Sequence, residues 1–365
     1  MKRPFLLMAI VVLAGLAILV WFLTRPDAVA EPVAAQESKS KPAMAHPEPP
    51  EVLQSLRTRA RELDAGVAVE PAHGQAKNVV AKFGWGSGAD QLGRNRPENG
   101  NPEGPMSLAV APGGEVVVLD QVNERLLKLD KNGKLLSTTP LPVRGAQDVA
   151  VAKDGTALVL DRSLDKSVAL VGPDGKVTGT LAVEGGGIPE GGAVTGVFSD
   201  GKDVYVEREH ADQVKIGTTS GQAAATRDEV PGRLSKDGTV YLTAGISQPG
   251  APGVYLMAIE AQSRQPRFSQ QYQLAAPVLA LTLLDTDRSG IIYLAALLEP
   301  AEGAAAMMSL MCLDPLDGRP LGVTQIPASS DADETFRELT VGEEGGVLYL
   351  YRTEQGAELQ RYDCR

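Results

Sequence analysis

GGEVVVLD (113–120) recurs as DGTALVLD (154–161), and this repetition decides the fold. In each copy a glycine precedes a short run of apolar residues, the pattern of a turn that leads into a buried strand. Weaker copies follow as DGKDVYVE (200–207), DGTVYLTA (237–244), SGIIYLAA (289–296) and GGVLYLYR (345–352). The chain therefore contains a β-type structural repeat in six copies.

The spacing of the repeat indicates the architecture. Its marker glycines are Gly114, Gly155, Gly201, Gly238, Gly290 and Gly346. A repeat of roughly 40–50 residues with several strands is typical of β-propeller blades, each a small sheet that buries its faces by stacking on its neighbours. For the first blade, the alternation of strands and turns predicts strands at 106–111, 115–120, 126–130 and 134–141.

The chain ends predict how the ring closes. The last repeat offers three strands, ELTVG, VLYLY and ELQRYD, and so lacks a fourth. A spare strand, NVVAKFGWG (78–86), lies ahead of the first blade. Placing it as the outer strand of the last blade joins the two ends of the domain and removes an exposed sheet edge. A seventh blade would need a further repeat, which we do not find, so we predict an all-β, six-bladed β-propeller over 77–365.

The N-terminus predicts a membrane anchor in residues 1–25. Pro4 to Leu23 carry no charge, and twenty helical residues span about 30 Å, the thickness of a hydrocarbon core. Lys2 and Arg3 precede this stretch, which places the rest of the chain outside the cytoplasm. We predict a single-pass protein of the inner membrane with a periplasmic propeller. The alternative is a signal peptide cleaved after Ala30, and it exports the same domain.

Two segments connect the anchor to the repeats. Residues 26–50 mix Pro, Ala, Glu and Lys without apolar periodicity and predict a disordered linker. Residues 51–76 contain EVLQSLRTRARELDAG, whose leucines at helical spacing predict a short amphipathic helix followed by a connector.

The net charge of the chain limits the kinds of molecule that it can be expected to bind. The net charge is −11, so the chain as a whole is repelled by nucleic acid and by anionic lipid surfaces. We therefore expect no nucleic-acid partner. A protein or another component of the cell envelope is the expected partner, and contact with the membrane is expected only through the N-terminal helix.

Residues 83–136 resemble an NHL repeat. The shared features are a Phe-Gly pair, a Gly-rich loop, a proline, a glycine before an apolar strand, an aspartate, an Asn-x-Arg element and an Asp-x-x-Gly turn. They fall at Phe83-Gly84, Pro105, Gly114, Asp120, Asn123, Arg125, Asp130 and Gly133. The second blade keeps Asp161 and loses Asn-x-Arg. The resemblance implies a six-bladed propeller of the NHL or TolB-like kind, whose members mostly bind macromolecules, although some relatives are lyases or lactonases.

Residues that bind metals or catalyse reactions form no recognisable cluster. The three histidines, His46, His73 and His210, are not at ligand spacing. Asp285-Thr286-Asp287-Arg288-Ser289-Gly290 resembles the start of a calcium loop, but the twelfth position is Ala296 rather than a bidentate glutamate, which favours a simple turn. We predict no catalytic residue, no metal site and no cofactor.

The two cysteines, Cys312 and Cys364, both lie in the exported part of the chain. An even pair in an oxidising compartment is compatible with a disulfide. The sequence does not show whether the two residues approach closely enough to bond, so both states remain open.

Loops at the entrance of the propeller supply the candidate binding residues. The loops 86–105, 142–147, 184–194 and 228–236 carry Arg94, Arg96, Glu98, Asn99, Arg144, Gln147, Glu190 and Arg233. The leading functional hypothesis is a non-enzymatic, membrane-anchored binding module. The alternative is a lactonase-like or lyase-like enzyme with a metal at the central channel, for which Asp148, Glu190 and Asp237 are candidates; metal content would distinguish the two.

Overall fold

The computed structural model describes residues 67–69, 72–73, 78–330 and 333–364. The predicted membrane helix, the linker 26–50 and the predicted helix that follows it lie outside these residues. None of the helices among the described residues is long and apolar enough to cross a bilayer.

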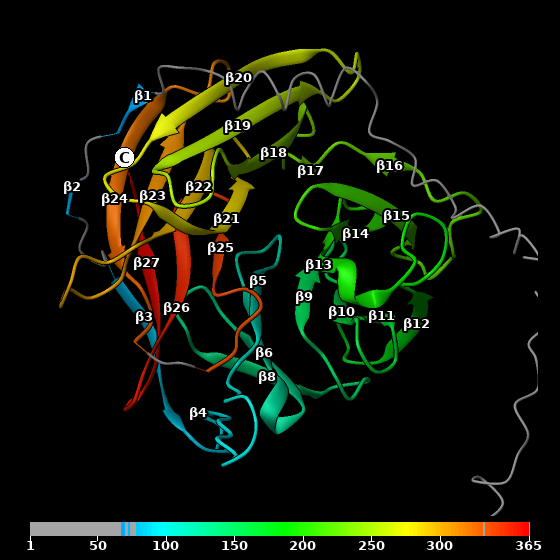
Figure 1. The fold of residues 1–365 in the computed structure, drawn as a ribbon. Coiled ribbons are helices and arrows are strands. Elements are labelled where there is room, and N and C mark those ends of the chain that lie inside the picture. Colours follow the sequence, from blue (N-terminus) through cyan, green and yellow to red (C-terminus); the bar gives the residue numbers. More distant parts are fainter. Residues whose placement is uncertain (1–66, 70–71, 74–77, 331–332, 365) are drawn as a thin grey trace, which may run out of the picture. The chain divides into compact units, whose positions relative to one another are not determined.

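Six sheets surround a common axis and form a six-bladed propeller, as predicted (Figure 1). Blade 1 contains β5 (Ser107–Val110), β6 (Val116–Asp120), β7 (Arg125–Leu129) and β8 (Leu135–Pro140). Blade 2 contains β9 (Asp148–Val151), β10 (Ala157–Asp161), β11 (Ser167–Val171) and β12 (Val177–Ala182). Blade 3 contains β13 (Val194–Ser199), β14 (Asp203–Arg208), β15 (Asp212–Thr218) and β16 (Glu229–Val230).

The second half of the ring has longer strands. Blade 4 contains β17 (Arg233–Leu234), β18 (Val240–Ile246), β19 (Gly253–Glu260) and β20 (Pro266–Gln273). Blade 5 contains β21 (Val278–Thr286), β22 (Ile292–Leu298), β23 (Met307–Leu313) and β24 (Pro320–Pro327). Blade 6 contains β25 (Leu339–Val341), β26 (Val347–Thr353), β27 (Gly356–Tyr362), β3 (Asn78–Trp85) and β4 (Gln91–Leu92). Two short 3₁₀ helices, η1 (Gln121–Asn123) and η2 (Gly191–Ala193), lie at the ends of strands.

The repeated glycines occupy the same turn in every blade. All six marker glycines have φ between 75° and 98°, in the left-handed region, and each lies in the turn between the first and second strands of its blade. A side chain with a Cβ atom is strained in this conformation, and glycine is not. The glycine therefore recurs in the sequence because the same backbone turn occurs in each of the six blades.

The chain closes the ring with a strand from its N-terminal side, as predicted. β3 pairs antiparallel with β27, with Phe83 opposite Ala357 and Ala81 opposite Leu359. The connector ahead of β3 adds two strands that the sequence did not predict. β1 (Val67–Ala68) pairs parallel with β20, and β2 (Ala72–His73) pairs parallel with β24. Figure 1 shows all three strands, in blue, at the outer edge of the ring.

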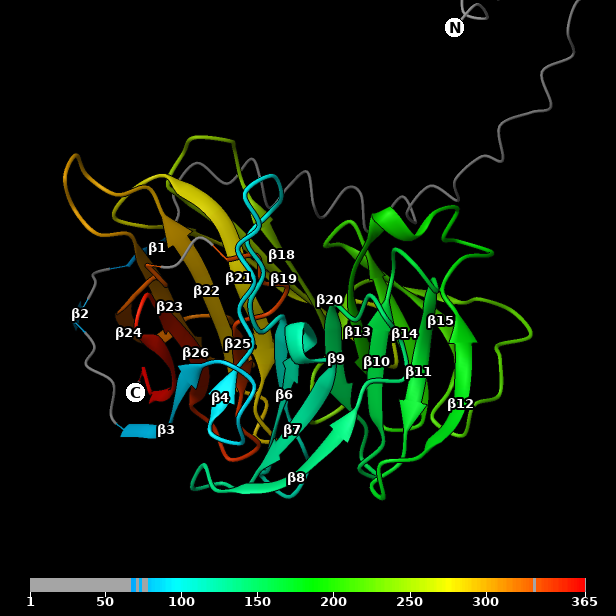
Figure 2. The ribbon, with the colours of Figure 1, turned by 90° about the horizontal axis from the view of Figure 1, so that it is seen from below.

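Apolar side chains between neighbouring blades form the core. Because each strand alternates its side chains between two faces, every blade presents one face to the blade before it and one to the blade after it. Large buried clusters join blades 1 and 2, 2 and 3, 4 and 5, 5 and 6, and 6 and 1. Figure 2 shows the strands of blades 1 and 2 from the side. The described residues form no comparable cluster between blades 3 and 4.

A disulfide joins the C-terminal end of the chain to the neighbouring blade. Cys312 lies in β23 of blade 5, and Cys364 follows β27 of blade 6, with 5.7 Å between their Cα atoms. Both cysteines are buried in the cluster that joins the two blades, beside Tyr349 and Tyr362. The bond therefore holds the last strand of the closing blade against blade 5.

Removing this bond should destabilise the domain. The double substitution Cys312→Ala/Cys364→Ala is expected to lower the free energy of unfolding by about 2–5 kcal/mol, because a long closed loop of the unfolded chain is released. Urea unfolding monitored by circular dichroism measures the change. The wild-type chain in reductant should unfold at a similar urea concentration; an unchanged midpoint in both samples would show that the bond contributes nothing to stability.

The residues that carry the resemblance to an NHL repeat form one hydrogen-bonded cluster. Asp120 is fully buried and accepts hydrogen bonds from the Arg125 guanidinium at 2.7 Å, the Asn123 amide at 2.8 Å and the Gly93 backbone N–H at 2.8 Å. Arg125 also donates to the backbone carbonyls of Gly88 and Gln91. The cluster therefore fastens the loop that leaves blade 6 onto the end of blade 1.

We expect Asp120→Ala to cost about 2–4 kcal/mol of unfolding free energy, since it leaves a buried guanidinium and two further donors without their acceptor. Asp130→Ala is the matched control. Asp130 accepts two exposed backbone hydrogen bonds in a hairpin of the same blade, and its loss should cost about 1 kcal/mol or less. Equal effects of the two substitutions in urea unfolding would contradict this assignment.

Candidate functional site

The strands that line the axis surround a cavity of about 350 Å³. All six blades contribute to its wall, but blades 1 and 2 contribute only small or apolar residues such as Ala109 and Val151. Its aromatic and charged lining comes mainly from blades 3 and 4 and from the segment that leads into β25. This cavity is the candidate functional site.

Phe198, in β13, lies between two arginines inside the cavity. The Arg233 guanidinium carbon is 4.4 Å from the ring centroid and that of Arg337 is 4.8 Å away. A guanidinium at this distance from an aromatic ring is attracted by the negative potential of the ring face. Since Arg233 begins β17 and Arg337 precedes β25, the ring links blade 3 to blades 4 and 6.

Each arginine is paired with a buried carboxylate. The Arg233 Nε atom donates to Glu207 Oε1 at 2.8 Å and its Nη2 atom to Oε2 at 3.2 Å, the two-pronged geometry of a strong pair. Its Nη1 atom donates to the carbonyl of Leu284 in blade 5. The Arg337 Nη2 atom donates to Asp148 Oδ2 at 2.6 Å. Two ion pairs therefore connect different blades at the cavity: Glu207, Arg233 and Arg337 line it, whereas Asp148 is fully buried outside its lining.

These contacts decide the protonation of the carboxyl groups. Burial raises the pKa of Glu207, but Arg233 and His210 outweigh it and lower that pKa to about 2. Burial also raises the pKa of Asp148 above its usual value, against the opposing effects of Arg337, the Ser107 hydroxyl and two backbone N–H groups. Glu207 is therefore a permanently ionised partner of Arg233 at neutral pH.

The interface between blades 3 and 4, which we name the seam, differs from the other five. In β14, Val204 and Val206 face blade 2, so the alternation turns Tyr205 and Glu207 toward blade 4. Gln213 lies directly across the ladder from Glu207 and shares its face. The opposing face of blade 4 carries Tyr241, Thr243, Tyr255, Met257 and Ile259. The seam is therefore a polar and aromatic extension of the cavity.

Of the entrance-loop residues predicted from sequence, Arg233 is the one that lines the cavity. Arg94 and Arg96 instead converge on the buried Asp333, each with an Nε–carboxylate distance of 2.9 Å, and both also reach Glu354. Their contacts join the loop after β4 to the segment that leads into β25. Arg94 and Arg96 therefore contribute to a contact between loops. That they also bind a partner stays a prediction.

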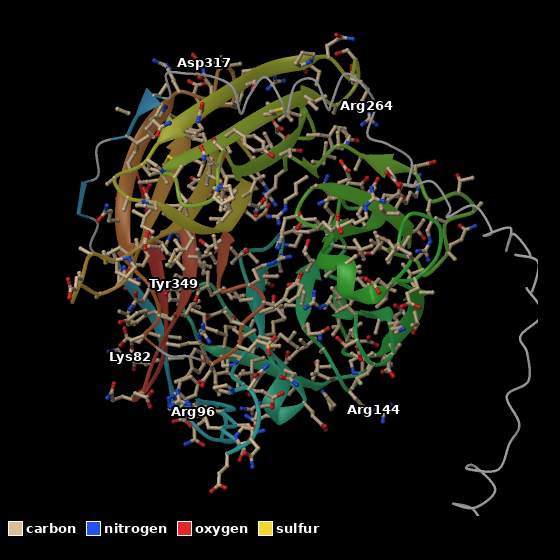
Figure 3. The ribbon with its side chains drawn as sticks, viewed as in Figure 1. Lys82, Arg96, Arg144, Arg264, Asp317 and Tyr349 are labelled. Carbon is tan, nitrogen blue, oxygen red and sulfur yellow. A yellow bond between two sulfur atoms is a disulfide. The ribbon has the colours of Figure 1, made fainter. Side chains whose placement is uncertain are left out.

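The remaining predicted residues lie around the rim. Arg144 is largely exposed, 3.8 Å from Asp165, and Figure 3 shows it at the edge of the ring. The Gln147 amide donates to the hydroxyl of Ser163. Glu98, Asn99 and Glu190 are exposed.

The three carboxylates considered for a metal do not meet. Asp148 is enclosed with Arg337, Glu190 precedes η2, and Asp237 lies in the turn before β18, where it accepts from Ser235 and Thr239. The described part of the chain contains no group of three or more His, Cys, Asp or Glu side chains placed to hold a metal ion. The calcium-like stretch forms a turn, as expected, in which Asp287 accepts from Ser289 and Ile291.

Sequence reasoning missed Phe198, Glu207, Gln213 and Arg337. A signal for Glu207 was present in β14. The second strands of blades 1 and 2 read VVVLD and ALVLD, whereas that of blade 3 reads DVYVER, with polar or aromatic residues at alternate positions. A strand buried on both faces that carries a polar face indicates a polar surface inside the ring. No comparable pattern indicates Arg337, because it lies in a loop.

The ion pair between Glu207 and Arg233 predicts how stability depends on pH. Because folding lowers the pKa of Glu207, its contribution is complete above the usual value of about 4.5 and is lost as the pH falls toward about 2. Relative to Glu207→Gln, the wild type should be more stable by about 3 kcal/mol near neutrality, and this difference should shrink between about pH 4.5 and pH 2. Urea unfolding across this range, with Glu98→Gln as a control at an exposed loop position, measures it; a constant difference would contradict the assignment.

The known proteins that are similar to this chain are solved structures of low sequence identity. The sequence matches no family profile and no curated protein. A member of the DUF4221 family from Bacteroides vulgatus has 10% identity and a TM-score of 0.49, over 80% of this chain and 98% of its own. Virginiamycin B lyase from Staphylococcus aureus has 11% identity and a TM-score of 0.40, over 74% and 99%. BamB from Moraxella catarrhalis has 9% identity and a TM-score of 0.37, over 80% and 99%.

Proposed function

We propose that this chain is a non-enzymatic binding module that takes a ligand or protein partner at the mouth of its central cavity. The carrying observation is the pair of compensated ion pairs on either side of Phe198. Glu207 stays ionised and bonded to Arg233, so this pair helps to hold the shape of the cavity and Glu207 has no proton to exchange at neutral pH. A rigid, preformed polar cavity lowers the entropic cost of binding.

The place of the module in the cell is part of the same proposal. The uncharged stretch from Pro4 to Leu23, preceded by Lys2 and Arg3, supports a single-pass anchor with the propeller outside the cytoplasm. The disulfide between Cys312 and Cys364 supports an oxidising compartment. Residues 26–50 then act as a spacer between the bilayer and the propeller.

We further propose that the chain is a member of the NHL or TolB-like propellers. The cluster of Asp120, Asn123 and Arg125 supports membership of the NHL or TolB-like propellers, because the residues that carry the resemblance act together. That resemblance implies binding of macromolecules.

Site-specific photo-cross-linking in the native envelope tests the binding role. A photoreactive residue at Arg144 or Glu190, on the loops that enter β9 and β13, should give one discrete adduct. The same residue at Lys176, in the β11–β12 hairpin at the opposite ends of the strands, is the control and should give none. Equal adducts from both ends of the ring, or none from the entrance loops, would overturn the proposal.

A further inference from the structure

The seam gathers most of the buried polar atoms that have no hydrogen-bond partner. Among the described residues, six buried side-chain nitrogen or oxygen atoms lack one. They are Gln121 Oε1, Asp203 Oδ1, Gln213 Nε2, Ser269 Oγ, Gln271 Oε1 and Arg352 Nε. Four of the six belong to blades 3 and 4. Burying a polar group without a partner costs about 1–3 kcal/mol, so such a concentration needs an explanation.

Strand alternation places these four residues on the two surfaces that face each other. Asp203 shares a face of β14 with Tyr205 and Glu207, and Gln213 lies opposite Glu207. On blade 4, Ser269 lies opposite Met257 and Gln271 lies opposite Tyr255. The other face of each blade is occupied by the apolar clusters shared with blades 2 and 5. The unpartnered atoms therefore point into one seam.

Gln213 connects the seam to the cavity. Its side chain lines the cavity together with Tyr205, Tyr241 and Thr243, although only 3% of the residue is exposed. Its Nε2 atom is a donor without an acceptor. A buried amide donor at the wall of a cavity is placed to bond an oxygen atom of a bound molecule.

The charges of the seam disfavour a charged ligand. Glu207 is neutralised by Arg233, and Asp203 by Lys215 at 2.6 Å. A further buried charge would have no counter-charge and would cost several kcal/mol. Of the four seam residues with unpartnered atoms, Gln213 is the one that lines the cavity, and its unpartnered atom is a donor. An uncharged hydroxyl oxygen can accept from this donor without bringing a charge into the site.

Size and shape add a further restriction. A cavity of about 350 Å³ is at the low end of the roughly 300–1,000 Å³ found for small-molecule sites. Tyr205 and Tyr241 supply flat apolar surfaces beside the polar groups. These features fit one or two hydroxyl-bearing rings better than an extended peptide strand.

We propose that the central cavity, at the part of its wall that the seam forms, binds an uncharged sugar unit of a glycan, with the Gln213 amide donating to one of its oxygens. This inference rests on the proposed binding function and names the class of ligand. Tyr205 and Tyr241 flank the ring, and the Glu207–Arg233 pair borders its hydroxyl groups.

Isothermal titration calorimetry on the full-length chain, in a detergent without a sugar headgroup, tests this assignment. The probes are maltotriose, cellotriose and tri-N-acetylchitotriose as neutral sugars, trigalacturonate as a charged sugar, and acetyl-tetraalanine amide as an uncharged peptide. At least one neutral sugar should bind. Gln213→Leu should weaken that binding at least about tenfold, while Gln121→Leu, which changes another glutamine with an unpartnered atom outside the seam, should not.

The Gln213→Leu variant also carries a folding readout. Because the Nε2 atom has no partner to lose, its urea midpoint should equal or exceed that of the wild type. Failure of all neutral sugars to bind, equal affinity in Gln213→Leu, or binding only of trigalacturonate or the peptide overturns the sugar assignment. If the entrance-loop cross-links persist in that case, the binding module stands and only its ligand class falls; loss of both removes the two proposals together.

Discussion

The structure depends on closing the ring, because no blade can bury both of its faces alone. Five interfaces meet this need with apolar clusters. The last blade can take part only because β3 pairs with β27 and completes it from the other end of the domain. The bond between Cys312 and Cys364 and the cluster around Asp120 lie on the two sides of this closure. Covalent and polar contacts thus support the blade that the chain completes last.

The seam between blades 3 and 4 is stabilised by a different kind of interaction. Here the ring is held by charge compensation and aromatic contact, through Glu207, Arg233 and Phe198, rather than by an apolar cluster. Polar groups in such an interface lose their hydrogen bonds to water on folding and replace them only where protein partners are present. The same residues, Glu207 and Arg233, therefore join blades 3 and 4 and line the cavity. The seam has the least apolar packing of the six interfaces, and its polar side chains also line the cavity, where they can contact a ligand.

Much of the fold was predictable because it depends on local chemistry. The turn at Gly114 and its five counterparts needs a residue without a Cβ atom, and that need repeats visibly along the chain. The closing strand was predictable because a blade with three strands leaves an open edge. β1 and β2 were not, since two-residue strands have no period to recognise. Of the site, Arg233 was predicted from its loop, whereas Arg94 and Arg96 proved to contact Asp333, which lies more than two hundred residues away in the chain.

The sequence by itself determined the class of fold, the number of blades and the strand that closes them, because turn residues and strand alternation are local. Only the tertiary structure decided that Cys312 and Cys364 bond, that Asp120, Asn123 and Arg125 form one cluster, and that Phe198 lies between two arginines. Each of these depends on contacts between blades. The physical reason is that a strand's sequence specifies which side chains share a face, while the curvature of the ring specifies what that face meets.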